Sequence, residues 1–269
     1  MSIIDPSDDP TTLAAAVEAN AWAAATAWGR ALGATFTETP DLLAFASGLP
    51  LQLGNMIIRA RLPADNTDAA IDAVLARFTA PHLPHCWLVG PATQPGDLGR
   101  RLAARGMFPD KAPGMAVALG TLPAAAPTPP GLTVDQVAGS AALRAWIDTL
   151  VGANPLPADV ARVLHGLHTQ HGYHPHPGVH YFLGRLDGAP VATSLLFYGA
   201  GVAGLYCVAT VPAARRQGIG AAVTLAPLLA ARAAGYRRGV LQSSGMGLGV
   251  YRALGFREAG RFSLYYSPS

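Results

Sequence analysis

One short segment combines the residue types that can bind a phosphate group. Two arginines are followed by two closely spaced glycines in Arg215-Arg216-Gln217-Gly218-Ile219-Gly220-Ala221. Glycine lets the backbone approach a ligand closely, and the first turn of a helix presents unpaired N–H groups at its positive dipole end. An apolar helical pattern begins at this segment, and a strand-like run ending at Pro212 precedes it. The segment therefore predicts a binding loop for a phosphorylated cofactor, whose identity these considerations leave open.

Two common phosphate-binding loops can be tested against this segment. A Walker loop requires Gly-Lys-Ser/Thr, and a Rossmann loop requires Gly-x-Gly-x-x-Gly with an acidic residue about 20 positions later. The segment matches neither pattern. It resembles instead the Arg/Gln-x-x-Gly-x-Gly/Ala pyrophosphate loop of the GCN5-related N-acetyltransferases, the GNAT family.

The surroundings of the loop extend this resemblance over roughly residues 133–269. A strand-like run precedes the loop, an apolar helix follows it, and a further strand is expected at 239–243. The segment Tyr251-Arg-Ala-Leu-Gly255-Phe256 resembles the family's Tyr-x-x-x-Gly-Phe. These features have the family's order and spacing. The resemblance implies an acyl-CoA-dependent N-acyltransferase that uses acetyl-CoA as co-substrate and requires no metal.

The resemblance also implies roles for individual residues. The backbone of Val208 and Thr210 would pair with the pantetheine arm where two strands splay apart, and the Val208 amide would face the thioester oxygen, as an oxyanion donor does. The Tyr251 hydroxyl would donate a proton to the departing CoA thiolate. The residues implied in cofactor binding are Val208, Ala209, Thr210, Arg215, Arg216, Gln217, Gly218, Ile219, Gly220, Ala221, Ser243 and Tyr251.

Several points of the chemistry stay open at this level. We expect direct attack by a primary amine in a ternary complex, because only Cys207 lies close enough to form an acyl-enzyme and its orientation is ambiguous. Candidates for the general base are His180, His168, Glu258 or a water molecule. A different acyl group, an oxygen acceptor and an acyl-CoA sensor without turnover are the alternatives.

Two other groups of residues could suggest different chemistry. Six histidines fall between positions 165 and 180, but the run is broken by prolines and glycines and holds no cysteine, so we expect no metal site. The histidines are expected to line the acceptor side of the cleft. Ser243-Ser244 lacks the Gly-x-Ser-x-Gly elbow of a serine nucleophile.

The amino-terminal half contains a weaker copy of the same pattern. The segment 98–108 resembles the helix and turn that end in Gly-Phe, but Gly90-Pro-Ala-Thr-Gln-Pro-Gly-Asp97 stands where the loop would be. Its prolines remove amide donors, and Asp97 would repel a pyrophosphate. We therefore expect two GNAT-like α/β domains, each with a mixed, largely antiparallel sheet flanked by helices. Residues 1–122 form a degenerate copy, 123–131 a Pro/Ala linker, and 132–269 the catalytic domain.

Periodicity predicts the elements of each half. Before the linker, we expect helices at 12–33, 65–78 and 97–104, an extended segment at 42–46, and strands at 55–61, 86–89 and 114–119, the last closing this half. After it, we expect helices at 140–151, 157–169, 217–234 and 249–254, and strands at 133–136, 181–186, 190–198, 203–209, 238–242 and 261–266. Asp187-Gly188 predicts a tight hairpin turn.

Composition limits the remaining classes of function. The chain has 269 residues, of which 13% are charged and 51% are hydrophobic, so it is expected to fold compactly. A net charge of +3 is too small to indicate nucleic-acid binding. The two cysteines are expected to be free, buried, reduced thiols in a cytoplasmic protein that has no membrane segment. Its partner would be a small-molecule amine, and it would be a monomer or homodimer.

Overall fold

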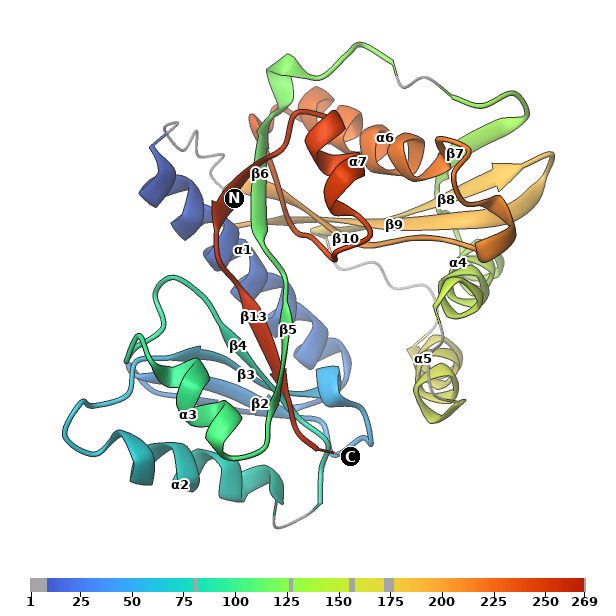
Figure 1. Ribbon diagram of the computed structural model, residues 1–269. Helices are drawn as coiled ribbons and strands as arrows, with labels where there is room; N and C mark the ends of the chain where they lie inside the picture. The colour runs from blue at the N-terminus through green and yellow to red at the C-terminus, as the bar shows by residue number, and fades with distance from the viewer. Residues whose placement is uncertain (1–8, 80–81, 126–127, 155–157, 172–176, 269) are drawn as a thin grey trace.

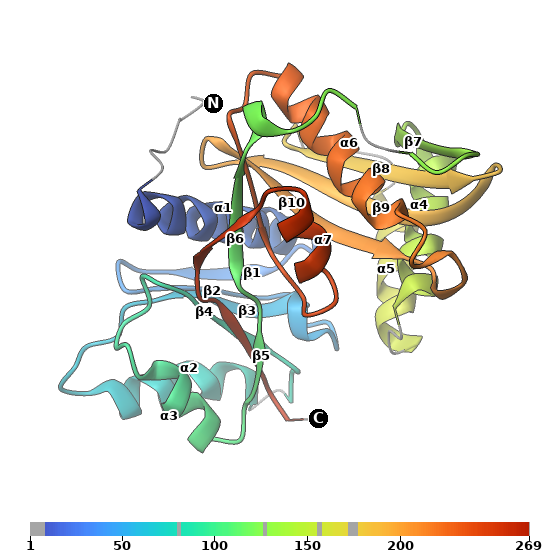
Figure 2. The same cartoon turned by 45° about the horizontal axis from the view of Figure 1, so that its top comes forward.

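The computed structural model describes residues 9–79, 82–125, 128–154, 158–171 and 177–268. Two mixed, largely antiparallel sheets lie one beside the other, with helices on their faces (Figure 1). This α+β architecture confirms the predicted fold class. The long helix α1 (Pro10–Ala31) lies between the two sheets (Figure 2). Its N-cap Asp9 accepts a hydrogen bond from the Thr12 amide, which is a favoured way to begin a helix.

The smaller sheet has six strands in the order β1-β2-β3-β4-β13-β5. Five of its strands and two helices come from the amino-terminal half: β1 (Thr35–Glu38), β2 (Leu42–Ala46), β3 (Asn55–Ala60), α2 (Thr67–Thr79), β4 (Cys86–Val89), α3 (Leu98–Ala104) and β5 (Phe108–Lys111). Helices α2 and α3 bury apolar residues against one face of this sheet. Trp22 and Trp28 of α1 pack against residues of the opposite face.

The larger sheet has seven strands in the order β12-β6-β11-β10-β9-β8-β7. Its elements are β6 (Gly114–Ala118), β7 (Leu132–Gln136), α4 (Ser140–Ala153), α5 (Ala158–His171), β8 (Val179–Leu186), β9 (Ala189–Gly199), β10 (Val202–Thr210), α6 (Ile219–Ala233), β11 (Arg238–Gln242), α7 (Leu248–Ala253) and β12 (Arg257–Gly260). Three short 3-10 turns, Gln52–Gly54, Leu119–Thr121 and Pro212–Ala214, complete the chain.

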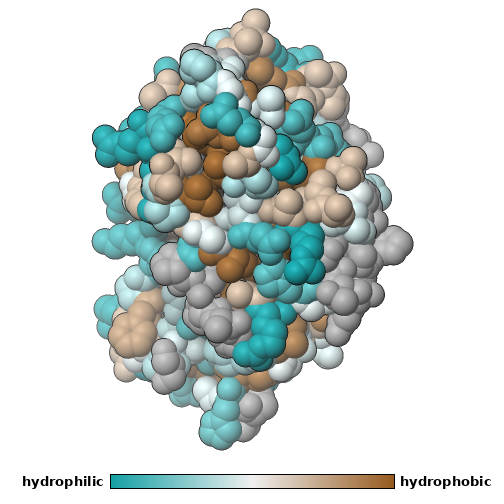
Figure 3. Space-filling view, turned by 90° about the vertical axis from the view of Figure 1, so that its right-hand side faces the viewer, coloured by the Kyte–Doolittle hydropathy of each residue, from teal (hydrophilic) through white to brown (hydrophobic). Residues whose placement is uncertain are grey.

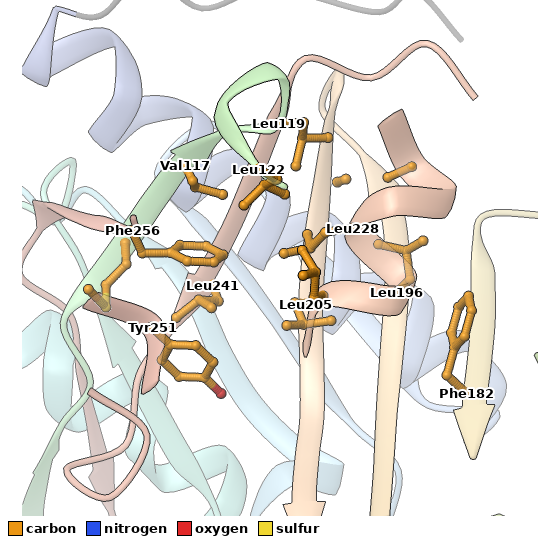
Figure 4. Close-up of a cluster of buried hydrophobic side chains, with 14 residues drawn as sticks. Val117, Leu119, Leu122, Phe182, Leu196, Leu205, Leu228, Leu241, Tyr251 and Phe256 are labelled. Carbon is orange, nitrogen blue, oxygen red and sulfur yellow. The ribbon is translucent and has the colours of Figure 1, made fainter. Parts of the chain in front are cut away.

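The two faces of the larger sheet are covered by different helices. Leu241 packs with Leu225 and Leu228 of α6 in the main core cluster (Figure 4). Its neighbour Val240 packs with Val17 and other α1 residues. Because successive side chains of a strand point to opposite faces, α6 and α1 cover opposite sides of the sheet.

Helix α6 continues through Pro227 without an interruption, although proline removes one helical hydrogen bond. The carbonyl that loses its partner belongs to Val223, and the buried Ser194 hydroxyl donates to it at 2.7 Å. This bond from β9 satisfies the orphaned carbonyl, so the helix accommodates Pro227 without a break.

Each half of the chain places its last strand in the other half's sheet. Strand β6 pairs with β11 and β12, with Met115 opposite Leu241. Strand β13 (Ser263–Tyr266) pairs with β4 and β5, with Ser263 opposite Val89. The prediction that 114–119 closes the amino-terminal half was wrong about its sheet. Periodicity identifies a strand but not its partner, so the sheets do not divide at the linker 123–131.

Candidate functional site

Strands β10 and β11 begin as neighbours and then separate. Their parallel pairing is limited to Ala203 with Gly239 and Gly204 with Val240. Beyond these pairs, β10 stays with β9 as far as Thr210, and β11 stays with β6 as far as Gln242. The gap opens into a cleft of about 290 Å³ lined by Leu150, Asn154, Leu205, Tyr206, Cys207, Val208, Ala209, Gln242, Ser244 and Tyr251.

A β-bulge in β10 sets the direction of one backbone amide at this gap. Cys207 and Val208 have no register partner in the described β9, and Cys207 has a φ of +50°. The Thr193 hydroxyl on β9 donates to the Cys207 carbonyl oxygen at 2.8 Å. In a trans peptide the C=O and the next N–H point in opposite directions. The Val208 N–H therefore points away from β9, toward the gap.

The glycine-containing loop beyond β10 is exposed and turns sharply into α6. Residues 215–218 are all exposed, and both Arg216 and Gly218 have positive φ angles, +64° and +80°. No side chain caps Gly218, the N-cap of α6. The amides of residues 216–220 donate to no acceptor among the residues that the structure describes, whereas the Ala221 amide donates to the Gly218 carbonyl at 3.1 Å. The loop thus offers several unpaired donors at the positive end of a helix dipole.

The space beside the two loop glycines is open. A Cβ at Gly220 would meet Thr210 Oγ1 at 4.0 Å, and one at Gly218 would meet Pro129 Cγ at 3.8 Å, and no described atom lies nearer in either case. Gly218 is explained by its backbone conformation. Gly220 has no such requirement, because neither its φ angle nor its neighbours exclude a side chain.

The polar side chains of the loop differ in their use. Arg215 donates from Nε to the Thr210 carbonyl at 3.0 Å and from its terminal nitrogen to the Ala153 carbonyl at 2.8 Å. It therefore ties the loop to the end of α4. Gln217 donates to the Ala213 carbonyl at 3.4 Å. Arg216 is the exposed guanidinium of the loop.

Tyr251 lies on the wall of the cleft. Its ring belongs to the main core cluster, with an edge contact to Phe256 at 5.7 Å between ring centroids. The hydroxyl points away from this cluster (Figure 4), and burial raises its pKa to about 12. A Cβ at Gly247 would overlap the ring at 2.6 Å. The glycine before α7 is therefore what makes room for Tyr251 at this position.

The structure separates the two adjacent serines. Ser243 is fully buried, and its hydroxyl donates to the Ser244 carbonyl oxygen at 2.8 Å. Ser244, not Ser243, lines the cleft. The contact of Ser243 with pantetheine stays a prediction.

Sequence reasoning missed the residues on the α1 side of the cleft. Tyr206 and Gln242 line it from β10 and β11, and Asn154 lines it from the end of α4. The Gln242 Nε2 atom is buried and has no hydrogen-bond partner among the described residues. The sequence does contain a signal for Gln242. Because residues two apart on a strand point to the same face, Gln242 lies on the same face as Val240, which α1 covers.

Two candidate bases whose side chains the structure describes, Glu258 and His180, do not line the cleft. Glu258 pairs with Arg252 at 2.6 Å, and His180 lies against Tyr198 with its pKa lowered by burial. The side chain of His168, and His174 and His176, lie outside what the structure describes. The described His165 faces Asp148 at 3.5 Å.

The two cysteines are unpaired, as predicted. Cys86 is buried in the smaller sheet, as predicted. The prediction was wrong for Cys207, which is exposed because the bulge directs it out of the strand pattern. The walls of the cleft limit solvation of the Cys207 thiolate and raise the pKa of this thiol to about 11. The thiol is therefore protonated at neutral pH, which makes it a weak nucleophile.

In the amino-terminal half, the corresponding loop uses its own amides. The Gly90 amide donates to Thr93 Oγ1 at 2.9 Å, and the Ala92 amide donates to the buried Glu18 carboxylate at 3.0 Å. Asp97 is paired with Arg101 at 3.0 Å, so it does not present a free charge. A carboxylate of the chain itself thus occupies an anion-accepting amide of this loop.

The chain also fills the gap between the splayed strands of this half. Strands β3 and β4 pair in parallel at two positions, as β10 and β11 do. Beyond these positions, the Gln94 amide donates to the Ala60 carbonyl at 3.0 Å and the Leu62 amide donates to the Gln94 carbonyl at 2.9 Å. Gln94 therefore acts as a short inserted strand, with a parallel bridge to Arg61.

The residues that the structure describes lack two kinds of feature. They contain no group of three or more potential metal ligands. None of their helices has the length and apolar character needed to cross a membrane. On the face that carries α4 and α5, apolar areas are bordered by hydrophilic side chains (Figure 3).

Comparison with known proteins identifies the architecture. No family model and no curated protein matches the sequence. A GCN5-related N-acetyltransferase from Kribbella flavida has a TM-score of 0.70 and 21% identity, covering 93% of this chain and 96% of its own. One from Sphaerobacter thermophilus has a TM-score of 0.62 and 15% identity, covering 99% and 94%. A tandem GNAT protein from the clavulanic acid biosynthesis pathway has a TM-score of 0.60 and 15% identity, covering 100% and 98%. The chain therefore has the tandem fold of the GCN5-related N-acetyltransferases.

Proposed function

We propose that the chain is an acyl-CoA-dependent N-acyltransferase that transfers acetyl from acetyl-CoA to a primary amine of a small molecule. The observation that carries this proposal is the gap between β10 and β11, toward which the Val208 amide points, together with the loop of unpaired amides that follows β10. An extended thiol arm and a pyrophosphate together require these two features. The fold of the structural relatives supports the same activity.

The loop supplies the pyrophosphate subsite. Amides of residues 216–220 would donate to phosphate oxygens, and the α6 dipole would favour their negative charge. Gly220 leaves open space beside these amides. Arg216 would add a charge-assisted contact, while Arg215 would hold the loop in position through Thr210 and Ala153.

Different residues would stabilise the thioester carbonyl oxygen and the departing thiolate. Acetyl-CoA supplies an activated thioester that an amine can attack directly. The Val208 N–H would donate to the carbonyl oxygen as negative charge develops there. Tyr251 would donate its hydroxyl proton to the thiolate, since its raised pKa keeps it protonated at physiological pH.

We assign the removal of the proton from the attacking amine to a solvent water molecule. None of the described residues that line the cleft is a carboxylate or a histidine. Direct attack is preferred to an acyl-enzyme because the Cys207 thiol is protonated at neutral pH.

Two measurements test this function. Calorimetric titration should detect acetyl-CoA binding with a stoichiometry of one per chain, because Gln94 fills the gap of the other half, and NADH should not bind. Thiol release from acetyl-CoA should then rise when primary amines are added. Binding without thiol release over a broad amine panel would favour an acyl-CoA sensor. Thiol release from propionyl-CoA but not from acetyl-CoA would mean that the transferred group is propionyl. Absence of acetyl-CoA binding would overturn the proposal.

A further inference from the structure

Helix α1 places an asparagine side chain in the apolar layer beneath the larger sheet. Asn20 is fully buried, and its Nδ2 donates to the Gly199 carbonyl at 2.9 Å and to the Val202 carbonyl at 3.5 Å. Its Oδ1 accepts a hydrogen bond from the Tyr206 hydroxyl at 2.7 Å. An amide buried in an apolar layer is costly unless its polar atoms are paired, and here they all are.

The sheet is shaped to admit this amide. A Cβ at residue 204 would overlap Asn20 Oδ1 and would lie 2.8 Å from Cε2 of Tyr206. Gly204 is therefore required by the pair formed by Asn20 and Tyr206. Such a requirement indicates a specific arrangement rather than a polar residue that the helix merely tolerates.

The pair lies directly beside the reacting end of the cleft. Tyr206 lines the cleft and is the last residue of β10 with a register partner before the bulge. The next two residues are Cys207 and Val208, whose shared peptide directs an N–H toward the gap. Burial raises the pKa of Tyr206 well above its usual value, so the hydroxyl keeps its proton. The hydroxyl donates this proton to Asn20 Oδ1, and the hydrogen bond fixes the orientation of the hydroxyl.

Helix α1 connects this pair to the other sheet. Trp22 and Trp28 on the same helix pack against Phe45 and Ile58 of the smaller sheet. The position of Asn20 is thereby set by the amino-terminal half, which has no open cofactor gap of its own.

We propose that Asn20 is a positioning residue for the transfer reaction. By holding the Tyr206 hydroxyl, it fixes β10 immediately before the bulge and so sets the direction of the Val208 N–H. This inference rests on the proposed function. It gives the amino-terminal half a defined role, which is to hold the oxyanion donor of the other half in place.

The first test follows the Val208 amide itself and needs no acceptor. In protein labelled with ¹⁵N-valine, the Val208 resonance should move downfield when acetyl-CoA replaces CoA, because only the thioester carbonyl accepts its hydrogen bond. Asn20→Ala and the milder Tyr206→Phe should each reduce this shift to less than about half. Val17→Ala is the control, because it creates a cavity beside the same helix but away from Tyr206. It should leave the shift intact while lowering the melting temperature.

The second test separates positioning from stability. With an amine acceptor, Asn20→Ala and Tyr206→Phe should each lower kcat about tenfold with KM for acetyl-CoA changed less than about twofold. The double variant should be no slower than Asn20→Ala, because both changes remove the same bond. A normal Val208 shift in the folded single variants, or effects that multiply in the double variant, would refute the role. Failure of the wild-type protein to bind acetyl-CoA would instead refute the proposed function.

Discussion

The hydroxyl of Thr193 holds the carbonyl oxygen of Cys207 at 2.8 Å, across the bulge between β9 and β10. Thr193 is fully buried, and Cys207 adopts a positive φ that costs a residue other than glycine about 1 kcal/mol or more. The hydrogen bond offsets part of this cost. It also determines that the next amide, that of Val208, points to the cleft.

Replacing Thr193 tests this arrangement. Thr193→Val should lower kcat about tenfold, because the peptide between Cys207 and Val208 is no longer held, and should destabilise the fold by about 1–2 kcal/mol through the unpaired carbonyl. Thr193→Ser keeps the hydroxyl and should retain most of the rate. Steady-state thiol release and urea unfolding measure the two effects. Equal rates for the valine and serine variants would contradict the role of the bond.

The hydroxyl of Tyr251 should serve as a proton donor over an unusually wide pH range. Its pKa is raised to about 12, so the donor form persists as pH rises and is lost only near that value. The kcat profile should therefore show no alkaline loss from this group below about pH 11. Tyr251→Phe should lower kcat by about 10²-fold or less at every pH while leaving acetyl-CoA affinity within about twofold.

Tyr236→Phe is the matched control for Tyr251→Phe. Tyr236 is also partly buried, but it stacks on Tyr198 at 4.3 Å and does not line the cleft. This variant should have the wild-type rate. If both variants have the same kcat, Tyr251 is a packing residue only.

Gly220 should separate stability from binding. Gly220→Ala places a methyl group where the nearest described atom is 4.0 Å away, and alanine is favoured over glycine within a helix by up to about 1 kcal/mol. The variant should melt at an equal or higher temperature, yet bind acetyl-CoA at least about tenfold more weakly, because the methyl group fills the space beside the loop amides. Differential scanning fluorimetry and calorimetric titration measure the two effects.

Gly166→Ala in α5 is the control for this loop variant, because a Cβ there meets no described atom within 4 Å. It should gain stability and leave acetyl-CoA affinity unchanged. Wild-type affinity in Gly220→Ala would mean that the pyrophosphate does not lie against this turn of α6.

The exchange of β6 and β13 should make the chain unfold as one unit. Calorimetry should show a single transition with calorimetric and van't Hoff enthalpies equal to within about 10%. Leu264→Asp in β13 should lower this one transition and acetyl-CoA binding together, although Leu264 lies in the other sheet. Leu53→Asp, at an exposed position, should change neither. Two resolved transitions would show that the sheets unfold independently.

Much of the fold could be predicted from sequence because strong periodic patterns mark its interior elements. Helix α6 and strands β9 and β10 lie close to their predicted positions. Strands β1, β5 and β12 were missed, since each exposes at least two of its four residues and so shows a weak apolar pattern. In β5 all four residues are exposed, so no buried face produces an alternating pattern.

The candidate site was predictable only in part. The loop 215–220 is identifiable because its glycines and helix start are local features of the sequence. The bond from Thr193 to Cys207, the insertion of Gln94 and the contact of Asn20 with Tyr206 join residues distant in the chain. A single sequence contains no signal for contacts between distant residues, so these contacts could be found only in the folded structure.

The reciprocal placement of β6 and β13 has a consequence for how such chains can be recombined. In a chain with this exchange neither half can be removed alone, because its loss would open an edge in the sheet of the other half and invite aggregation. The amino-terminal half, in which Gln94 fills the gap between β3 and β4, is thereby needed to complete the sheet that carries the cleft. Recombination can replace both halves together, but it cannot transplant one of them as a module.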